Sequence, residues 1–380
     1  MARGTTYERN GRWYVRFDAG PDPATGERRQ RSGGGHDTKR EAEAALAKLL
    51  VDVHQGAHVD PSRQTVAEYC RYWLEVVIPG AIRDTSLRIY RTDVDHIISR
   101  LGAHRLVAVR AGHISRAFRV WEEEGLGGST RELLYTRLSQ IFRQAVRERV
   151  LAANPMDGVT APKAEPAERF AWSPEQLALA LARLAPSKDY PLWRLLALSG
   201  LRRGEGLGLR WRDVNWDRGC IRVEQQVTQI GGSVRLTAPK TPRSRRTVEL
   251  DTETMRTLTA HRQTQLARRL AHPAWQDLDL VYPRRDGSPY RSTTICWRWR
   301  QLIQSWPDLP YLTLHGLRHT HASILMAEDG NVRMIADRLG HDPMVLLRIY
   351  AHAGESAQRR GVSRLVTALG GAQQRADGAP

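Results

Sequence analysis

The chain has 380 residues, a net charge of +17 and a sequence pI of about 10.4. Hydrophobic residues make up 41% of it, enough to form the cores of two or three domains. It contains no run of about 18 apolar residues and no apolar signal segment, so we expect a cytoplasmic protein without a membrane span. The positive charge favours a nucleic-acid partner and hence a nucleoid-associated location. The three cysteines are odd in number and far apart in the sequence, a pattern that indicates neither a disulfide framework nor a zinc site.

Residues 1–63 are predicted to form a small hairpin-and-helix module. Residues 12–17 alternate as a strand should, residues 21–26 have turn chemistry, and residues 27–31 are suited to a return strand. Thr38 and Glu41 form a capping-box pattern that begins a helix. Basic residues could lay the hairpin in a DNA groove, although a solvated folding unit remains the alternative. These residues are Arg12, Arg16, Arg28, Arg29 and Arg31.

Residues 64–160 are predicted to form a helical domain. Apolar residues recur at helical spacing from Val66 to Leu74, and again in 85–101, 114–123 and 130–150. The Asn154-Pro155 pair ends the last of these helices. About four helices with one apolar face each are expected here.

A linker rich in Pro, Ala and charged residues follows at 161–171, and a mixed domain is predicted over 172–365. Its helices begin at Ser173-Pro174 and run to about Trp211. Strands are expected at 220–227, 234–236 and 246–250, and helices again from about residues 251, 292, 315, 331 and 343. Residues 366–380 form a tail. The expected fold class is therefore mainly α with small β-sheets (α+β).

Three short motifs in this last domain carry the chemistry. Arg202 lies in Ser-Gly-Leu-Arg-Arg-Gly-Glu, His315 and Arg318 lie in one His-x-x-Arg motif, and Tyr350 follows His341 by nine residues. Arginine binds phosphate with a planar fork of donors and stays charged. Two arginines, two histidines and a tyrosine can hold a phosphodiester and attack it without a metal ion.

This pattern resembles the tyrosine recombinase (phage integrase) family, which cuts and rejoins DNA through a phosphotyrosine bond. The resemblance implies that Arg202 and Arg318 bind the scissile phosphate and that Tyr350 is the nucleophile. His315 is then the general acid and base, and His341 donates a hydrogen bond to the phosphate. Glu205 is expected to be buried and to orient Arg202. Residues 1–63 resemble the arm-site DNA-binding domain of integrases, and residues 64–160 the core-binding domain.

A basic segment between two predicted strands completes the expected site. Lys240 is placed to protonate the leaving 5′ oxygen. Arg243, Arg245 and Arg246 are expected to contact the DNA backbone.

The resemblance implies a site-specific recombinase that integrates or excises a mobile element. It implies double-stranded DNA with attachment-type sites as substrate, a homotetramer on two duplexes, and an accessory DNA-bending or directionality protein. One phosphodiester replaces another in this chemistry, so no cofactor or metal is expected. The sequence does not name the target site or the type of element that carries the gene.

Three alternatives are open to the sequence. His315 and His319 are spaced to bind zinc on one helix, but Arg318 between them would repel a cation. A non-catalytic DNA-binding regulator would suit the basic charge, but binding alone does not need a tyrosine at 350. A type IB topoisomerase shares the chemistry, but the three-part organisation favours a recombinase.

Overall fold

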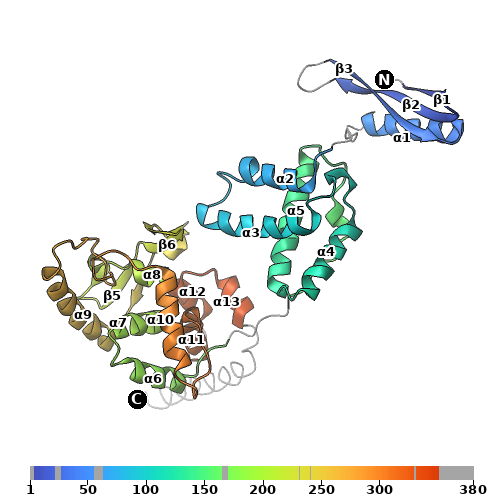
Figure 1. The fold of residues 1–380 in the computed structure, drawn as a ribbon. Helices are drawn as coiled ribbons and strands as arrows, with labels where there is room; N and C mark the ends of the chain where they lie inside the picture. Colours follow the sequence, from blue (N-terminus) through green and yellow to red (C-terminus); the bar gives the residue numbers. More distant parts are fainter. Residues whose placement is uncertain are drawn as a thin grey trace, which may run out of the picture. The chain divides into compact units, whose positions relative to one another are not determined.

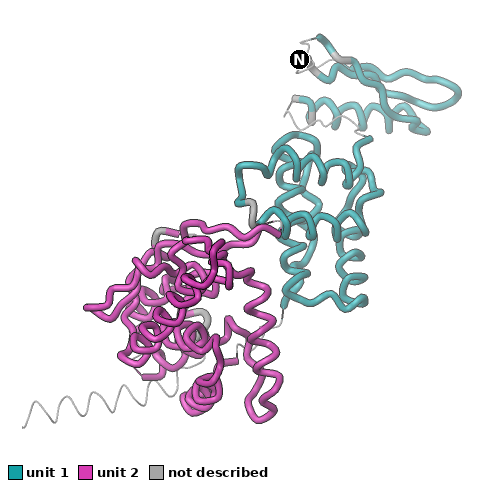
Figure 2. The backbone as a smooth tube through the Cα atoms, turned by 60° about the vertical axis from the view of Figure 1, so that its left-hand side comes forward, with its two compact units in different colours: residues 1–166 teal, residues 167–380 magenta. Residues whose placement is uncertain are grey.

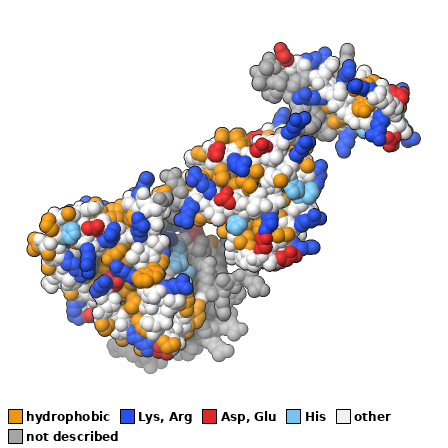
Figure 3. Space-filling model, viewed as in Figure 1, with side chains coloured by type: hydrophobic (Ala, Val, Ile, Leu, Met, Phe, Trp, Pro, Cys, Tyr) orange, Lys and Arg blue, Asp and Glu red, His pale blue; other side chains and the backbone are white. Residues whose placement is uncertain are grey.

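The computed structural model describes residues 4–21, 27–54, 63–164, 170–230, 232–239, 241–328 and 331–350. For some of these, including Arg29 and Tyr350, it describes the backbone alone. The chain forms two compact units, residues 1–166 and residues 167–380 (Figure 2). Lysine and arginine side chains are exposed on both units (Figure 3). Among the described helices, none is long and apolar enough to span a membrane.

The N-terminal part of the first unit is a three-stranded antiparallel sheet covered on one face by a helix (Figure 1). Its elements are β1 (Gly4–Arg9), β2 (Arg12–Pro21), β3 (Arg28–His36) and α1 (Lys39–His54). Val15 and Phe17 of β2 pack on Ala42 of α1 in a small core. Thr38 and Glu41 exchange the hydrogen bonds of the predicted capping box. Strand β1 was not predicted, because it lacks the apolar alternation that marks a half-buried strand.

The rest of the first unit is helical and has its own core. Its helices are α2 (Val66–Tyr72), α3 (Asp84–Leu101), α4 (Ala111–Glu123) and α5 (Gly128–Arg147). A π-helical turn, Trp73–Val77, continues α2, and 3-10 turns lie at Leu106–Ala108 and Pro155–Gly158. Inside the bundle, Arg137 donates to Asp93 (2.9 Å) and lies over the ring of Tyr90. This buried pair links α3 to α5 by a polar contact.

The second unit begins with helices and ends with helices. They are α6 (Pro174–Leu184), α7 (Tyr190–Ser199), α8 (Arg203–Gly208), α9 (Thr252–Leu270), α10 (Ser292–Gln304), α11 (Leu314–Glu328), α12 (Val332–Leu339) and α13 (Pro343–Tyr350). Ser173 caps α6 by accepting from the backbone N–H of Gln176, with Pro174 at the first helical position. A large core that includes Trp193 and Trp299 joins α6, α7 and α10 to the sheets.

Two small sheets lie between α8 and α9. Strands β4 (Val214–Asn215), β5 (Cys220–Val223) and β8 (Arg246–Glu249) form one antiparallel sheet. Strands β6 (Gln226–Ile230) and β7 (Ser233–Thr237) form a hairpin. The overall fold is mostly helical with small sheets, which confirms the predicted fold class.

Glycines let α8 approach the β6 hairpin closely. A Cβ at Gly208 would lie 2.7 Å from the Cα of Gln226, and one at Gly204 would lie 2.7 Å from the carbonyl oxygen of Val227. Helix α8 therefore packs backbone against backbone, which fixes the position of Arg202, the residue just before it.

Candidate active site

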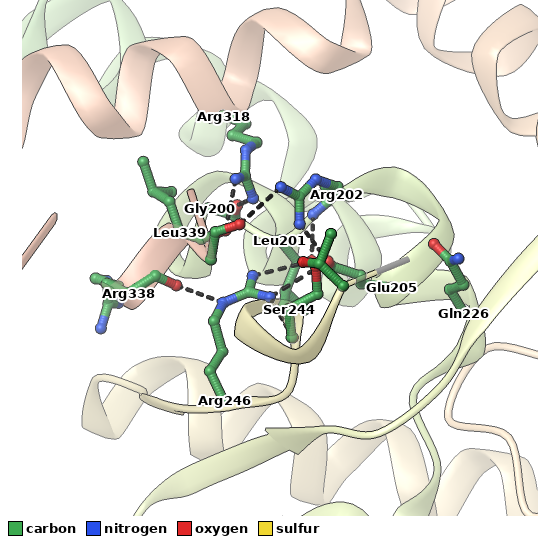
Figure 4. A network of polar contacts seen from close by, with 12 residues as sticks. Gly200, Leu201, Arg202, Glu205, Gln226, Ser244, Arg246, Arg318, Arg338 and Leu339 are labelled. Carbon is green, nitrogen blue, oxygen red and sulfur yellow. Dashed lines mark hydrogen bonds and ion pairs between the residues drawn. The ribbon is translucent and has the colours of Figure 1, made fainter. Parts of the chain in front are cut away.

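The carboxyl end of α12 is the centre of the site. Gly340 ends this helix in the left-handed conformation (φ 63°), so the last carbonyl groups turn toward neighbouring elements. Three successive carbonyl oxygens, those of Arg338, Leu339 and Gly340, each accept a hydrogen bond from a different arginine (Figure 4). Cations are favoured at this end because the helix dipole is negative there.

Arg202 is held by two partners. Its Nη1 donates to Oε1 of Glu205 (2.8 Å), and its Nη2 donates to the carbonyl of Gly340 (2.9 Å). The Arg202 side chain is 32% exposed, whereas that of Glu205 is 1% exposed. Glu205 also accepts from the backbone N–H of Arg202 (2.9 Å) at the start of α8. The buried carboxylate therefore fixes the guanidinium while an edge of it stays accessible.

Arg318 projects from α11 toward the same helix end. It donates from Nη1 to the carbonyl of Gly200 and from Nη2 to that of Leu339, both at 2.6 Å. Gly200 has φ 65°, and a Cβ there would lie 2.6 Å from the side chain of Leu339. A glycine therefore allows the backbone at residue 200 to lie this close to the end of α12. The Arg318 residue is 2% exposed. The structure thus brings both predicted phosphate-binding arginines to one turn.

The two predicted catalytic histidines are neutral at pH 7. His315 is exposed at the surface, yet desolvation by its neighbours and the charges of His319, Arg318 and Arg202 lower its pKa to about 4. Partial burial and the charges of Arg318, Arg202 and Arg246 lower the pKa of His341 to about 3. Nδ1 of His341 is buried and has no hydrogen-bond partner among the described residues, a state that is unusual outside functional sites.

Arg246, which was expected to contact the DNA backbone, is bonded to other parts of the protein in this structure. Its side chain is only 6% exposed and donates both Nη atoms to Glu205, Nη2 at 2.9 Å. Its Nε donates to the carbonyl of Arg338 (2.6 Å). By contrast, Arg243 and Arg245 are 65% and 61% exposed, and they pair at the surface with Asp342 (2.8 Å) and Glu224 (3.9 Å). Burial against Glu205 turns Arg246 toward the protein instead.

Glu205 remains a carboxylate despite its burial. Burial raises the pKa of this carboxyl, but the hydrogen bonds and charge of Arg246 and the charge of Arg202 outweigh burial, and the net pKa is lowered. The charge of Glu205 is therefore shared between two guanidinium groups.

The buried side chain of His321, whose role was not identified from the sequence, connects the helices that carry the site. His321 donates or accepts at Nδ1 with the carbonyl of Ala197 (3.1 Å), and its Nε2 accepts from Nε of Arg338 (3.0 Å). Since Nε2 accepts, Nδ1 carries the proton. The His321 side chain thereby ties α11 and α7 to α12, and no short motif in the sequence signals this contact.

The remaining predicted residues are placed as follows. Lys240 lies outside the described residues, between β7 and β8 in sequence, and Tyr350 is the last residue of α13. Arg12 and Arg16 are exposed on the N-terminal sheet, where Arg16 lies over the ring of Tyr7. Arg28 is exposed and paired with Asp18 (2.6 Å). The side chain of Arg29 lies outside the described part of the chain.

The histidine pair that suggested a zinc site does not form a ligand group. The rings of His315 and His319 meet edge to face with centroids 4.9 Å apart. Among the described residues, no group of three or more His, Cys, Asp or Glu side chains could hold a metal ion. At Gly316, between these histidines, a Cβ would lie 2.5 Å from the side chain of Leu312. The side chain of Leu312 thus packs directly against this glycine.

Family models and curated relatives match most of the chain. The model of the phage integrase family matches residues 175–356, and that of an arm DNA-binding domain matches residues 5–53. A "tyrosine recombinase XerC-like" protein of Caldanaerobacter subterraneus is 25% identical, covering 96% of this chain and 99% of that protein. The ICEBs1 integrase of Bacillus subtilis is also 25% identical, covering 94% and 97%.

Solved structures share the fold. The Tn1549 transposon integrase in complex with circular intermediate DNA has a TM-score of 0.69 at 19% identity, covering 80% of this chain and 99% of that one. A lambda integrase dimer bound to a core site has a TM-score of 0.59 at 18% identity, covering 92% and 95%. The two family models, over residues 175–356 and 5–53, identify the chain as a member of the phage integrase (tyrosine recombinase) family with an N-terminal arm DNA-binding domain.

Proposed function

We propose that this site-specific tyrosine recombinase cuts each DNA strand with Tyr350 and rejoins it to a partner strand. The observation that carries the proposal is the meeting of Arg202, Arg318 and His341 at the end of α12. From that point the chain continues directly into α13, which ends at Tyr350. The turn at which these side chains meet and the proposed nucleophile are therefore carried by two consecutive helices, α12 and α13.

In the proposed reaction, the hydroxyl oxygen of Tyr350 attacks the scissile phosphorus. A 3′-phosphotyrosine forms and the bond to the 5′ oxygen breaks. His315, being neutral, accepts the tyrosine proton, and Lys240 protonates the leaving 5′ oxygen. Arg202 and Arg318 stabilise the charge on the non-bridging oxygens, and His341 donates one hydrogen bond to them. Attack by a 5′-hydroxyl from the partner duplex reverses the step.

We also propose the assembly in which this occurs. A lambda integrase tetramer bound to a Holliday junction shares the fold, with a TM-score of 0.56 at 18% identity. By analogy, four copies of this chain would act on two duplexes with attachment-type sites. The domains at 64–160 and 172–365 would bind the crossover site and residues 1–63 the arm sites, with an accessory DNA-bending or directionality protein. Integration or excision of a mobile element would result.

A suicide substrate tests the central step. The full-length protein is incubated in chelator with nicked duplex DNA from the region that flanks its gene, and a covalent adduct is sought on a denaturing gel. The wild type should form an adduct that Tyr350→Phe abolishes without loss of DNA binding. Tyr311→Phe is the matched control, since Tyr311 is 54% exposed before α11 and should leave the adduct unchanged.

Two results would count against the proposal. Specific DNA binding without any adduct would indicate a non-catalytic regulator. An adduct that persists in Tyr350→Phe would place the nucleophile elsewhere.

A further inference from the structure

The negative charge of buried Glu205 lies directly beside Arg202, the arginine proposed to bind the phosphate. A buried carboxylate that pairs with Arg202 alone would cancel most of the positive charge that the phosphate needs. The pair would be neutral, and Arg202 would be drawn toward the protein. The carboxylate is nevertheless the group that orients Arg202, through Nη1 at 2.8 Å and the backbone N–H at 2.9 Å.

Arg246 takes up this negative charge. Its Nη1 donates to Oε1 of Glu205 at 3.2 Å and its Nη2 donates to Oε2 at 2.9 Å, which is a bidentate geometry. Each carboxylate oxygen is therefore shared between Arg202 and Arg246. Arg318 binds the same turn through the carbonyl of Leu339, so three guanidinium groups and one carboxylate leave this cluster with a net positive charge of about two.

Arg246 is also attached to the turn that holds the other two arginines. Its Nε donates to the carbonyl of Arg338 at 2.6 Å, and its Nη1 would lie 3.1 Å from a Cβ at Gly340. Nη1 further donates to the carbonyl of Ser244 (3.0 Å), which fixes the end of the segment that contains Lys240. One side chain thus joins β8, the start of α8 and the end of α12.

We propose that Arg246 is a positioning residue that acts through Glu205 to keep Arg202 both oriented and fully charged toward the scissile phosphate. This inference rests on the proposed function of the site. It assigns Arg246 a role distinct from those of its exposed neighbours Arg243 and Arg245, which face solvent.

Single-turnover cleavage of the suicide substrate at saturating DNA tests the assignment. Arg246→Met should slow adduct formation by about 10- to 100-fold, the scale expected for misplacement of a catalytic group. Its DNA affinity should change little, because the side chain is buried. Arg246→Lys keeps the charge without the fork and should show a smaller loss. Arg222→Met is the matched control, since Arg222 pairs with Glu224 at the same 2.9 Å on neighbouring β5 but is 67% exposed.

Two further measurements distinguish a positioning role of Arg246 from a purely structural one. On a substrate with a neutral methylphosphonate at the scissile position, the charge of Arg202 matters less, so the deficit of Arg246→Met should shrink. In the double variant Glu205→Gln/Arg246→Met, the amide oxygen can still accept from Arg202 while the uncompensated charge is gone, so cleavage should be faster than in Arg246→Met alone. A purely structural role predicts equal deficits on both substrates and additive losses in the double variant.

The outcomes distinguish the two proposals. If the wild type forms no adduct, the proposed function fails. If the wild type cleaves and Arg246→Met cleaves equally fast, or if it loses only DNA affinity, the positioning role is overturned and Arg246 is at most a DNA contact.

Discussion

Arg202 donates a hydrogen bond to the carbonyl oxygen of Gly340, a residue 138 positions later in the chain (2.9 Å). Arg318 donates to the carbonyl just before it, that of Leu339. The end of α12 is thus a common support for two side chains that arrive from different helices. Small changes at this turn should therefore disturb both arginines together.

Arg202→Met and Arg318→Met should separate catalysis from stability. Each should slow cleavage by about 10²- to 10³-fold, because each removes a donor to the charged phosphate. Only Arg318→Met should also lower the free energy of unfolding markedly, by about 1–3 kcal/mol, since it leaves two buried carbonyl groups without a donor. Urea unfolding and suicide-substrate kinetics measure the two effects. Equal loss of stability in both variants would contradict the difference in burial.

Gly340→Ala should damage the site through the backbone. A left-handed alanine costs about 1–2 kcal/mol of unfolding free energy, and its Cβ would lie 3.0 Å from the carbonyl of Arg243. Cleavage should slow because Arg246 and both carbonyls must shift. Gly219→Ala is the control: its φ is also 63°, but its nearest neighbour is 3.8 Å away. It should cost similar stability and leave the cleavage rate unchanged.

Gly208→Ala should destabilise the junction of α8 and β6. The added Cβ would meet backbone atoms of Gln226 at 2.7 and 2.9 Å, and neither element can yield easily. We expect a loss of about 1–3 kcal/mol in the free energy of unfolding, as for other overpacked sites. Gly112→Ala, in the first turn of α4 with open space around it, should instead gain up to about 1 kcal/mol. Thermal and urea unfolding of the two variants would show opposite signs.

Stability should fall as the pH is lowered from about 6.5 toward 3. Burial, followed by the charge of Arg338, lowers the pKa of His321 to about 3 from its ordinary 6.5, and the pKa values of His315 and His341 are lowered similarly. In this window the unfolded chain binds protons that the folded chain does not. Stability is therefore fully present above 6.5 and is lost at up to about 1.4 kcal/mol per pH unit for each proton.

The histidine contribution can be isolated between pH 6.5 and 5, above the range where most carboxylates titrate. His321→Gln removes one of the titrating groups and should reduce the slope of unfolding free energy against pH. An unchanged slope would mean that His321 has the same pKa in the folded and the unfolded chain.

The exposed arginines of the β7–β8 segment should act on DNA affinity. Arg243→Met and Arg245→Met should each lower the slope of log affinity against log salt by about 1, the value for one lost phosphate contact. Their effect should be similar for specific and unrelated DNA. An unchanged salt slope would place the segment away from the DNA backbone.

Local signals in the sequence were sufficient for much of the fold. Ser173-Pro174 and Thr38–Glu41 are capping sequences that mark the start of a helix, and both caps form as predicted. The His-x-x-Arg and Leu-Gly-His motifs likewise mark residues that meet at one turn. Strand β1 was missed because its sequence has no apolar periodicity and pairs mainly through its backbone.

The role of Arg246 could not be read from local sequence. Arg245 and Arg246 are adjacent and chemically identical, yet one is exposed and the other buried. What separates them is Glu205, 41 residues earlier, and the carbonyl of Arg338, 92 residues later. Only tertiary packing brings those partners to one of the two arginines.

The arrangement at the end of α12 also bears on the chain as it is being made. Arg202 and Arg246 leave the ribosome long before the carbonyl groups of residues 338–340 that hold them. A nascent or truncated chain that stops short of α12 has the arginines without their anchor, and it lacks Tyr350 as well. On the proposed mechanism, we expect such fragments to be unable to cleave DNA, because the site becomes complete only when the last helix of the domain has been made.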